Sequence, residues 1–168
     1  MATTESVKLE ELFQEANSLI GENKIADAVT LLEEIIGEEP RFGKAYNHLG
    51  WIYETKFKDY KRGEEYYKLC LNFSPEYSPA YSNYAYLLSA LGRYDDLEKH
   101  LNFAVTVQGT DRPVLMNEFG IMYEQKGDFA KALEYYKKAI AMTLSDVNLE
   151  TYGKSLTRVK KKMELLAG

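Results

Sequence analysis

The sequence is poor in the residues that build covalent cross-links and metal sites. It holds one cysteine, Cys70, and two histidines, His48 and His100, among 168 residues. A single cysteine excludes an internal disulfide and any multi-cysteine zinc site, and two histidines leave little for metal chemistry. We therefore expect neither a metal nor a cofactor.

Proline, glycine and long apolar runs are also scarce. The chain has 4 Pro and 11 Gly, which excludes collagen-like structure and Pro/Gly-rich disorder. No run approaches the roughly 18 apolar residues of a membrane span, and the acidic opening MATTESVKLEEL lacks the apolar segment of a secretory signal. The net charge of −5 argues against a whole-domain nucleic-acid footprint. We expect a soluble, cytoplasmic protein whose partners include neither membrane nor nucleic acid.

Small and large residues recur along the chain at intervals of 34 or 35 residues. Two series of mostly small residues are Ala16, Gly50, Ala85, Gly120 and Ala28, Gly63, Leu97, Ala132, with Leu97 as the large exception. Two series of large apolar residues are Leu12, Tyr46, Tyr81, Met116 and Leu19, Tyr53, Leu88, Tyr123. Such self-similarity predicts four copies of one structural unit.

Each unit has the pattern of two short helices. In the second unit, Tyr46, Leu49, Gly50 and Tyr53 are spaced as i, i+3, i+4 and i+7, which is the apolar face of a helix. A polar stretch follows, and then a second helical run. In the fourth unit the turn contains Gly127-Asp128, a residue pair typical of a helix end followed by a helix cap.

On these residues the chain resembles the tetratricopeptide repeat family, whose 34-residue motif is W-x2-L-G-x2-Y, then A-x3-F, then P. The second unit matches best, the fourth lacks the final proline, and the first and third are looser. The resemblance covers about residues 9–145. It implies an all-α fold, a right-handed α-solenoid of four helical hairpins, with repeats at about 9–42, 43–77, 78–111 and 113–145 in one domain, residues 1–168.

Residues 146–166 predict a further helix. Its apolar residues from Leu149 to Leu166 form a single stripe. A stacked array leaves its last repeat with an uncovered apolar face, so we expect this helix to cap that face. The alternative is a helix that binds a partner or a membrane surface.

No catalytic motif is present, and we expect no enzymatic activity. Cys70 falls at a helix-packing position, which favours a buried structural thiol over a nucleophile. His100 precedes the packing residue Leu101, and we expect it to be exposed and solvated. The adjacent acidic pairs Glu33-Glu34 and Glu38-Glu39 do not converge on a point and are expected on solvated faces.

The resemblance implies a concave surface lined by the first helix of each hairpin. The expected peptide-binding residues on it are Asn47, His48, Trp51, Asn83, Tyr86, Asn117 and Ile121, and Phe13 falls at a matching position. A carboxamide donates and accepts hydrogen bonds, so the asparagines suit the backbone of an extended peptide. Trp51 and Tyr86 would anchor its side chains. In the alternative interpretation Trp51 packs against a neighbouring helix and the asparagines bind water.

The best-known function of this family, docking acidic chaperone tails through a carboxylate clamp, does not fit the sequence. That clamp needs converging cations, and Lys44 stands nearly alone among acidic residues at the corresponding positions. We therefore expect a protein partner that offers a neutral to basic segment, either an extended peptide or a helix.

Charge is divided unevenly along the chain. Residues 1–40 contain 10 acidic and 2 basic residues, whereas Lys154, Arg158 and Lys160–Lys162 concentrate positive charge in the last helix. The simplest reason for those cations is the dipole at a helix C-terminus. The first function to consider is an adaptor or assembly scaffold that binds a partner in its groove. The alternative is a structural repeat unit that associates through its ends, and we expect a monomer or weak self-association.

Overall fold

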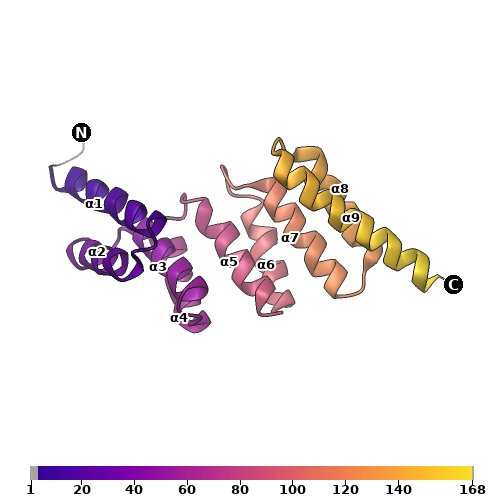
Figure 1. Cartoon of the computed structure of the whole chain (residues 1–168), viewed down its shortest axis with the longest axis horizontal. Helices are drawn as coiled ribbons and strands as arrows, with labels where there is room; N and C mark the ends of the chain where they lie inside the picture. The colour runs from indigo at the N-terminus through magenta and orange to yellow at the C-terminus, as the bar shows by residue number, and fades with distance from the viewer. Residues whose placement is uncertain (1–3, 168) are drawn as a thin grey trace. The chain divides into compact units, whose positions relative to one another are not determined.

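A computed structural model describes residues 4–167 of the chain, with side chains from Ser6 onward. This part consists of helices joined by short turns and contains no strand (Figure 1). The nine helices of the described residues are α1 Thr4–Gly21, α2 Ile25–Glu38, α3 Gly43–Thr55, α4 Tyr60–Phe73, α5 Pro79–Ala90, α6 Tyr94–Ala104, α7 Arg112–Gln125, α8 Phe129–Met142 and α9 Asp146–Leu166. Their order agrees with four predicted hairpins and a terminal helix. None of these helices is long and apolar enough to cross a membrane.

The chain forms two compact units, Met1–Asn83 (unit 1) and Tyr84–Gly168 (unit 2), with the boundary inside α5. In unit 1, α1 packs against α2 and α3 against α4, each as an antiparallel pair (Figure 1). In unit 2, α7 packs against α8 and α8 against α9. The prediction of one domain with four repeat boundaries stays a prediction, and each unit is described by itself.

An aspartate side chain caps the N-terminus of three helices, α4, α7 and α8. Asp59, Asp111 and Asp128 each accept a hydrogen bond from the backbone N–H three residues later, at 3.1–3.2 Å. These bonds satisfy N–H groups that have no partner inside the helix. The helix starts are therefore encoded locally in the sequence.

The four turns inside the hairpins share one backbone feature. Each has a residue with positive φ, and these residues are Asn23, Lys58, Gly92 and Gly127. Glycine and asparagine adopt this conformation at little cost, whereas lysine is strained in it. The expected Gly127-Asp128 turn is confirmed, and the second hairpin makes the same turn with a less suitable residue.

The core of unit 1 is made of aliphatic residues from α1, α2 and α3. Leu32, Ile35, Leu49 and Ile52 are fully buried there. Phe13, which we expected in the groove, is only 4% exposed. Its ring lies 5.6 Å from Phe42 and 4.7 Å from His48 between centroids, so it belongs to the core because α3 covers this face of α1.

In the second and fourth hairpins, a glycine lets a tyrosine ring lie directly against a helix backbone. A Cβ atom added to Gly50 would be 2.7 Å from the ring of Tyr67, and one added to Gly120 would be 2.6 Å from the ring of Tyr136. At the equivalent positions the other two hairpins have alanine with leucine, namely Ala16 with Leu32 and Ala85 with Leu101. All eight positions are buried. Glycine is thus always paired with tyrosine and alanine with leucine, so the two positions of the repeat vary together.

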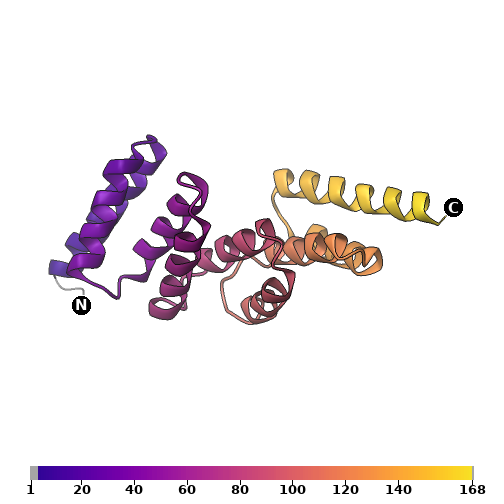
Figure 2. The same cartoon turned by 90° about the horizontal axis from the view of Figure 1, so that it is seen from below.

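Helix α9 packs along α8, and the C-terminal end of α9 extends beyond α8 (Figure 2). Val159 and Leu156 contact the cluster formed by Ala132 and Tyr136, which confirms a terminal helix that covers the last hairpin. The stripe is covered only in its middle. Leu149, Met163 and Leu166 are exposed, and α9 has 21 residues against the 14 of α8.

Candidate functional site

The structure divides the seven predicted groove residues between the two units. Unit 1 holds Asn47, His48, Trp51 and Asn83, and unit 2 holds Tyr86, Asn117 and Ile121. The first four gather around one hollow. The other three are distributed over α5 and α7 of unit 2.

The hollow of unit 1 has a volume of about 320 Å³ and is walled by α1, α3 and the start of α5. Its lining residues are Asn17, Ile20, Asn47, His48, Trp51, Tyr77, Pro79 and Asn83. Repeat spacing brought four of these together as candidates. Ile20 and Tyr77 were missed, because neither falls at a position that the family motif assigns to the groove.

Two of the predicted asparagines bind each other. Asn83 Nδ2 donates to Asn47 Oδ1 at 3.0 Å, across 36 residues of sequence. Asn47 is only 4% exposed. The bond occupies one donor and one acceptor of the pair, so Asn47 Nδ2 and Asn83 Oδ1 are the amide groups outside it.

His48 carries no charge in this hollow. Its Nδ1 lies 3.1 Å from the carbonyl oxygen of Lys44, an acceptor, so Nδ1 holds the proton and Nε2 is the acceptor. Burial lowers the pKa of His48 below its usual value. The imidazole is therefore a neutral hydrogen-bonding group at neutral pH.

Trp51 combines the two interpretations left open by the sequence. It lines the hollow, and it is half-buried against the core of the first hairpin. The ammonium of Lys56 lies 5.4 Å from the centroid of its ring. One part of the indole stabilises the fold while another faces the hollow.

Lys44 is neutralised by an ion pair. Its Nζ lies 2.7 Å from Glu10 Oε1, and both side chains are partly exposed. As far as the described residues extend, neither Lys44 nor any other lysine or arginine lines the hollow. The arrangement can bind groups through neutral hydrogen bonds and apolar contact.

The unit 2 candidates lie in different surroundings. Tyr86 is 43% exposed. Asn117 is partly buried, and its Oδ1 is buried without a hydrogen-bond partner. Ile121 packs at the edge of the cluster around Tyr136 and acts as a core residue. The neighbour of Asn117, Glu118, is a carboxylate only 3% exposed. Its burial was not foreseen.

The remaining chemically active residues have structural surroundings. Cys70 is fully buried, as expected, and burial raises the pKa of its thiol to about 12, so it is not a nucleophile at neutral pH. His100 is not solvated as predicted: its ring packs edge-on against Tyr84 with centroids 4.8 Å apart. Glu33 and Glu34 are exposed as expected. Within residues 4–167, no cluster of three His, Cys, Asp or Glu side chains could hold a metal ion.

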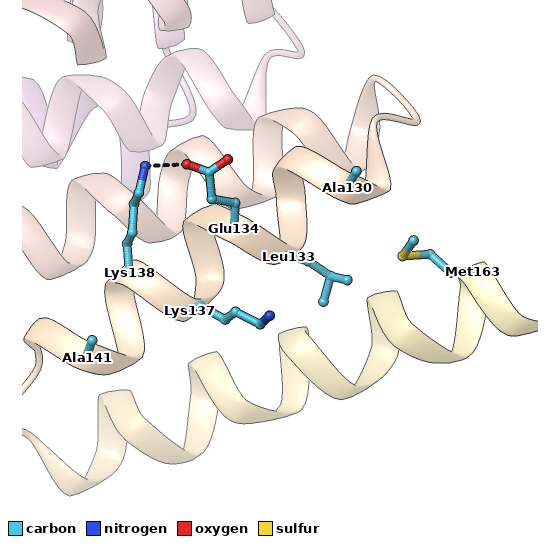
Figure 3. A pocket seen from close by; sticks show the side chains of 7 residues that line it. All are labelled: Ala130, Leu133, Glu134, Lys137, Lys138, Ala141 and Met163. Carbon is cyan, nitrogen blue, oxygen red and sulfur yellow. Dashed lines mark hydrogen bonds and ion pairs between the residues drawn. The ribbon is translucent and has the colours of Figure 1, made fainter.

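A second hollow lies between α8 and α9 and has a volume of about 530 Å³ (Figure 3). Leu133 and Met163 lie on the facing sides of the two helices, with Ala130 and Ala141 farther along α8. Lys138 pairs with Glu134 at its edge, at 2.6 Å. This hollow is apolar at its base and charged at its rim.

Models of one protein family match most of the chain. Two models described as tetratricopeptide repeat match residues 13–78 and 77–145. No curated protein sequence gives a significant match.

Several solved structures have the same fold. PilF of Pseudomonas aeruginosa has a TM-score of 0.81 and 19% identity, and the match covers 93% of this chain and 69% of that one. PilW, a type IV pilus biogenesis factor, has a TM-score of 0.75 and 16% identity over 95% of this chain and 80% of that one. YrrB, a tetratricopeptide repeat protein described as having an unusual peptide-binding site, has a TM-score of 0.71 and 18% identity over 98% of this chain and 86% of that one. At such identities these matches concern the fold alone, and they confirm the predicted all-α repeat solenoid.

Proposed function

Because this chain belongs to the tetratricopeptide repeat family, we propose that it is a non-enzymatic adaptor or assembly scaffold that holds a peptide segment of a partner protein in the hollow of unit 1. An interaction scaffold is the general function that this fold suggests. The finer proposal concerns which surface binds and what it binds. A cytoplasmic location stays a prediction from the sequence.

The observation that carries the proposal is the composition of the hollow. Neutral hydrogen-bonding groups, Asn47, His48 and Asn83, lie beside the large apolar surface of Trp51 and Tyr77. A peptide backbone needs both donors and acceptors, and an aromatic wall gives contact area at low entropic cost. This combination suits an extended segment or one face of a helix.

The charge of the hollow favours a neutral to basic segment over an acidic tail. Lys44, the lysine that the sequence singled out, does not line the hollow and is paired with Glu10 at 2.7 Å. A terminal carboxylate that used Lys44 would have to break this pair. We propose accordingly that the chain is not a carboxylate-clamp protein.

Among the structural neighbours, YrrB is described as having an unusual peptide-binding site. Its 18% identity supports a common fold and nothing about residues. The peptide proposal for this chain therefore rests on the hollow itself.

Trp51, the single tryptophan of the chain, gives a direct test. Random decapeptides displayed on phage are selected on the immobilised full chain, and the selected peptides are titrated while tryptophan emission is recorded. We expect binding to shift the emission, and Asn83→Ala, which retains Trp51, to weaken binding by about tenfold or more, as for a central interface residue.

The matched control is Leu69→Ala, since Leu69 is an exposed apolar residue on α4 outside the hollow. Its affinity should equal that of the wild type. The Trp51→Ala variant has no tryptophan emission, so its binding is measured by titration calorimetry. Equal binding by wild type, Asn83→Ala and Trp51→Ala would overturn the proposal, provided that all variants keep their helical circular dichroism.

The α8–α9 hollow favours the second candidate, self-association through the ends of the chain. The C-terminal end of α9 extends beyond α8 (Figure 2). In its last two turns, Leu165 and Leu166 are exposed, and so are Lys160 and Lys161. Residues 1–40 supply the opposite charge. Light scattering at low and high salt tests it: a dimer or larger species at low salt that dissociates at high salt supports association, and a monomer at both refutes it.

A further inference from the structure

Glu118 in unit 2 is a buried carboxyl group without a cation. Its hydrogen-bond partners are the side chain of Ser89 and Asn117 Nδ2, the latter at 3.5 Å. In the described part of the chain, neither lysine nor arginine pairs with it. Burial raises the pKa of Glu118 to about 7. Buried carboxylates are normally paired or well hydrogen-bonded, so this one lacks a partner of opposite charge.

The residue beside it has an unused acceptor. Asn117 Oδ1 is buried and has no hydrogen-bond partner. Native structures leave few such atoms unsatisfied, and each one calls for an explanation. Of two neighbouring residues on α7, Glu118 thus lacks a cation and Asn117 Oδ1 lacks a hydrogen-bond donor.

Two tyrosines and one aspartate lie near Glu118. Tyr86 on α5 and Tyr152 on α9 interact electrostatically with each other, with Glu118 and with Asp111 at the start of α7. Burial, reinforced by these acidic neighbours, raises the pKa of each tyrosine to about 12. Tyr152 is 4% exposed and Tyr86 is 43% exposed, so Tyr86 is the one of the two that faces solvent.

We infer that Tyr86, Asn117, Glu118 and Tyr152, with Asp111 beside them, form a receptor for one cationic side chain of a partner, an arginine guanidinium. The guanidinium has five N–H donors in a plane, enough to serve both the Glu118 carboxylate and Asn117 Oδ1. Its flat face can stack on a tyrosine ring. The inference rests on the proposed function only in taking the arginine from a peptide.

The site predicts that binding is coupled to a proton. A carboxyl group with a pKa of about 7 is partly protonated at neutral pH. A cation beside it favours the ionised form and lowers the pKa. Arginine binding should therefore release a proton from Glu118 and strengthen as the pH rises through 7.

The probe is the pentapeptide acetyl-Gly-Gly-Arg-Gly-Gly-amide, compared with peptides that have norleucine or lysine in place of arginine. The full chain is labelled with carboxyl-¹³C glutamate, and the pKa of Glu118 is measured by NMR with and without each peptide. We expect the arginine peptide to lower it by about one pH unit or more, the lysine peptide to have a smaller effect, and norleucine none. Equal effects of arginine and norleucine would overturn the inference.

Variants locate the site. Glu118→Gln keeps the shape of the side chain and should weaken the arginine peptide by about tenfold, whereas Glu134→Gln on the surface of α8 should not. Because a buried substitution can impair folding, Tyr86→Leu provides a second test at an exposed position, with an expected loss of about threefold or more. Unchanged affinity in folded Glu118→Gln or Tyr86→Leu would refute the site.

The two proposals can fail separately. Trp51→Ala should leave the pentapeptide's affinity unchanged, since Trp51 is not among the residues of this receptor. Arginine binding that depends on Glu118, with no decapeptide bound through Trp51, would refute the function proposed for unit 1 and keep the receptor. Decapeptides bound through Trp51, with no arginine pentapeptide bound through Glu118, would keep the function proposed for unit 1 and refute the receptor.

Discussion

The second and fourth hairpins contain the same arrangement of glycine, tyrosine and glutamate, but the pKa of the glutamate is raised in the second and lowered in the fourth. In each, a tyrosine ring lies against a glycine, and its hydroxyl donates to a glutamate on the facing helix. Tyr67 Oη is 2.6 Å from Glu54 Oε2, and Tyr136 Oη is 2.7 Å from Glu124 Oε2. The local geometry is therefore a property of the repeat.

The surroundings of the two glutamates differ. Burial raises the pKa of Glu54 above its usual value. Glu124 also accepts two bonds from Arg158, at 2.8 and 2.7 Å, and one from Lys162 at 2.7 Å. These bonds, those from Arg158 above all, lower the pKa of Glu124 to about 2. Both cations come from α9.

This difference shows how the terminal helix is attached. Part of the positive charge that the sequence concentrates in α9 is used to neutralise Glu124, a buried carboxylate of the last hairpin. A helix dipole alone does not explain Arg158, whose guanidinium makes a two-bond contact with Glu124. Within the described residues no lysine or arginine bonds to Glu54, which has the tyrosine hydroxyl and the nearby charge of Lys58.

Removal of each glutamate gives the largest expected effect. Glu124→Ala leaves the Tyr136 hydroxyl without its acceptor and releases Arg158 and Lys162, so we expect a loss of about 3 kcal/mol in the free energy of unfolding. Glu54→Ala removes one hydrogen bond and should cost about 1 kcal/mol. Urea denaturation followed by circular dichroism measures both. Equal losses would mean that α9 adds nothing to the arrangement.

The contributions of Glu124 and Glu54 to stability should depend on pH in opposite ways. The pKa of Glu124 in the folded protein, about 2, is below the usual 4.5, so its contribution is present above pH 4.5 and is lost as the pH falls from 4.5 towards 2. Glu54 has a raised pKa, so its contribution is complete below pH 4.5 and is lost as the pH rises through its folded pKa. Relative to wild type, Glu124→Ala should be less sensitive to acid, and Glu54→Ala should gain relative stability at neutral pH. Parallel pH profiles of the three proteins would contradict this.

The glycine and tyrosine of each arrangement can be exchanged together. Gly120→Ala places a Cβ 2.6 Å from the Tyr136 ring, and overpacking of this kind costs about 1–3 kcal/mol. Adding Tyr136→Leu recreates the alanine–leucine pair of the first and third hairpins and should recover part of that loss. A double variant less stable than the sum of both single changes would show that the pairs are not interchangeable.

The smallest expected effect concerns the turns. Lys58 has φ of 58° where the fourth hairpin has Gly127 at 79°. Lys58→Gly relieves a left-handed conformation that costs lysine about 1–2 kcal/mol, and the greater freedom of the unfolded glycine chain offsets part of this. We expect a net gain of about 0.5–1 kcal/mol. Gly127→Lys should lose about as much, and the opposite signs distinguish turn strain from an effect of lysine charge.

The local features of the fold were predictable because each is encoded within a few residues. Helix starts at Asp59 and Asp128 and the turn at Gly127 follow from capping and backbone freedom. The 34- to 35-residue recurrence predicted the four hairpins, and the length of the apolar stripe predicted the extent of α9. The misassigned residues, Phe13 and His100, were judged from their position in a motif, and their burial depends on what packs over them.

The site was predictable in part for the same reason. Asn47, His48 and Trp51 lie on one helix, so periodicity alone places them on one side of it. That Asn83 bonds to Asn47 depends on how α5 packs beside α3, across 36 residues. That they bind a ligand stays a prediction. Glu118 was overlooked because a charged residue in a sequence is assumed to be solvated, and its neighbours Tyr86 and Tyr152 lie on other helices.

The sequence by itself determined the family, the all-α repeat fold and the terminal helix, since all of these depend on periodicity and local conformational preference. Tertiary structure alone decided which carboxylates are compensated. Glu54 and Glu124 occupy the same position of the repeat, and the charge that reaches one of them comes from α9, more than 30 residues away along the chain. Electrostatic energy depends on distance in space and on burial, and neither can be read from a repeat that looks the same in both places.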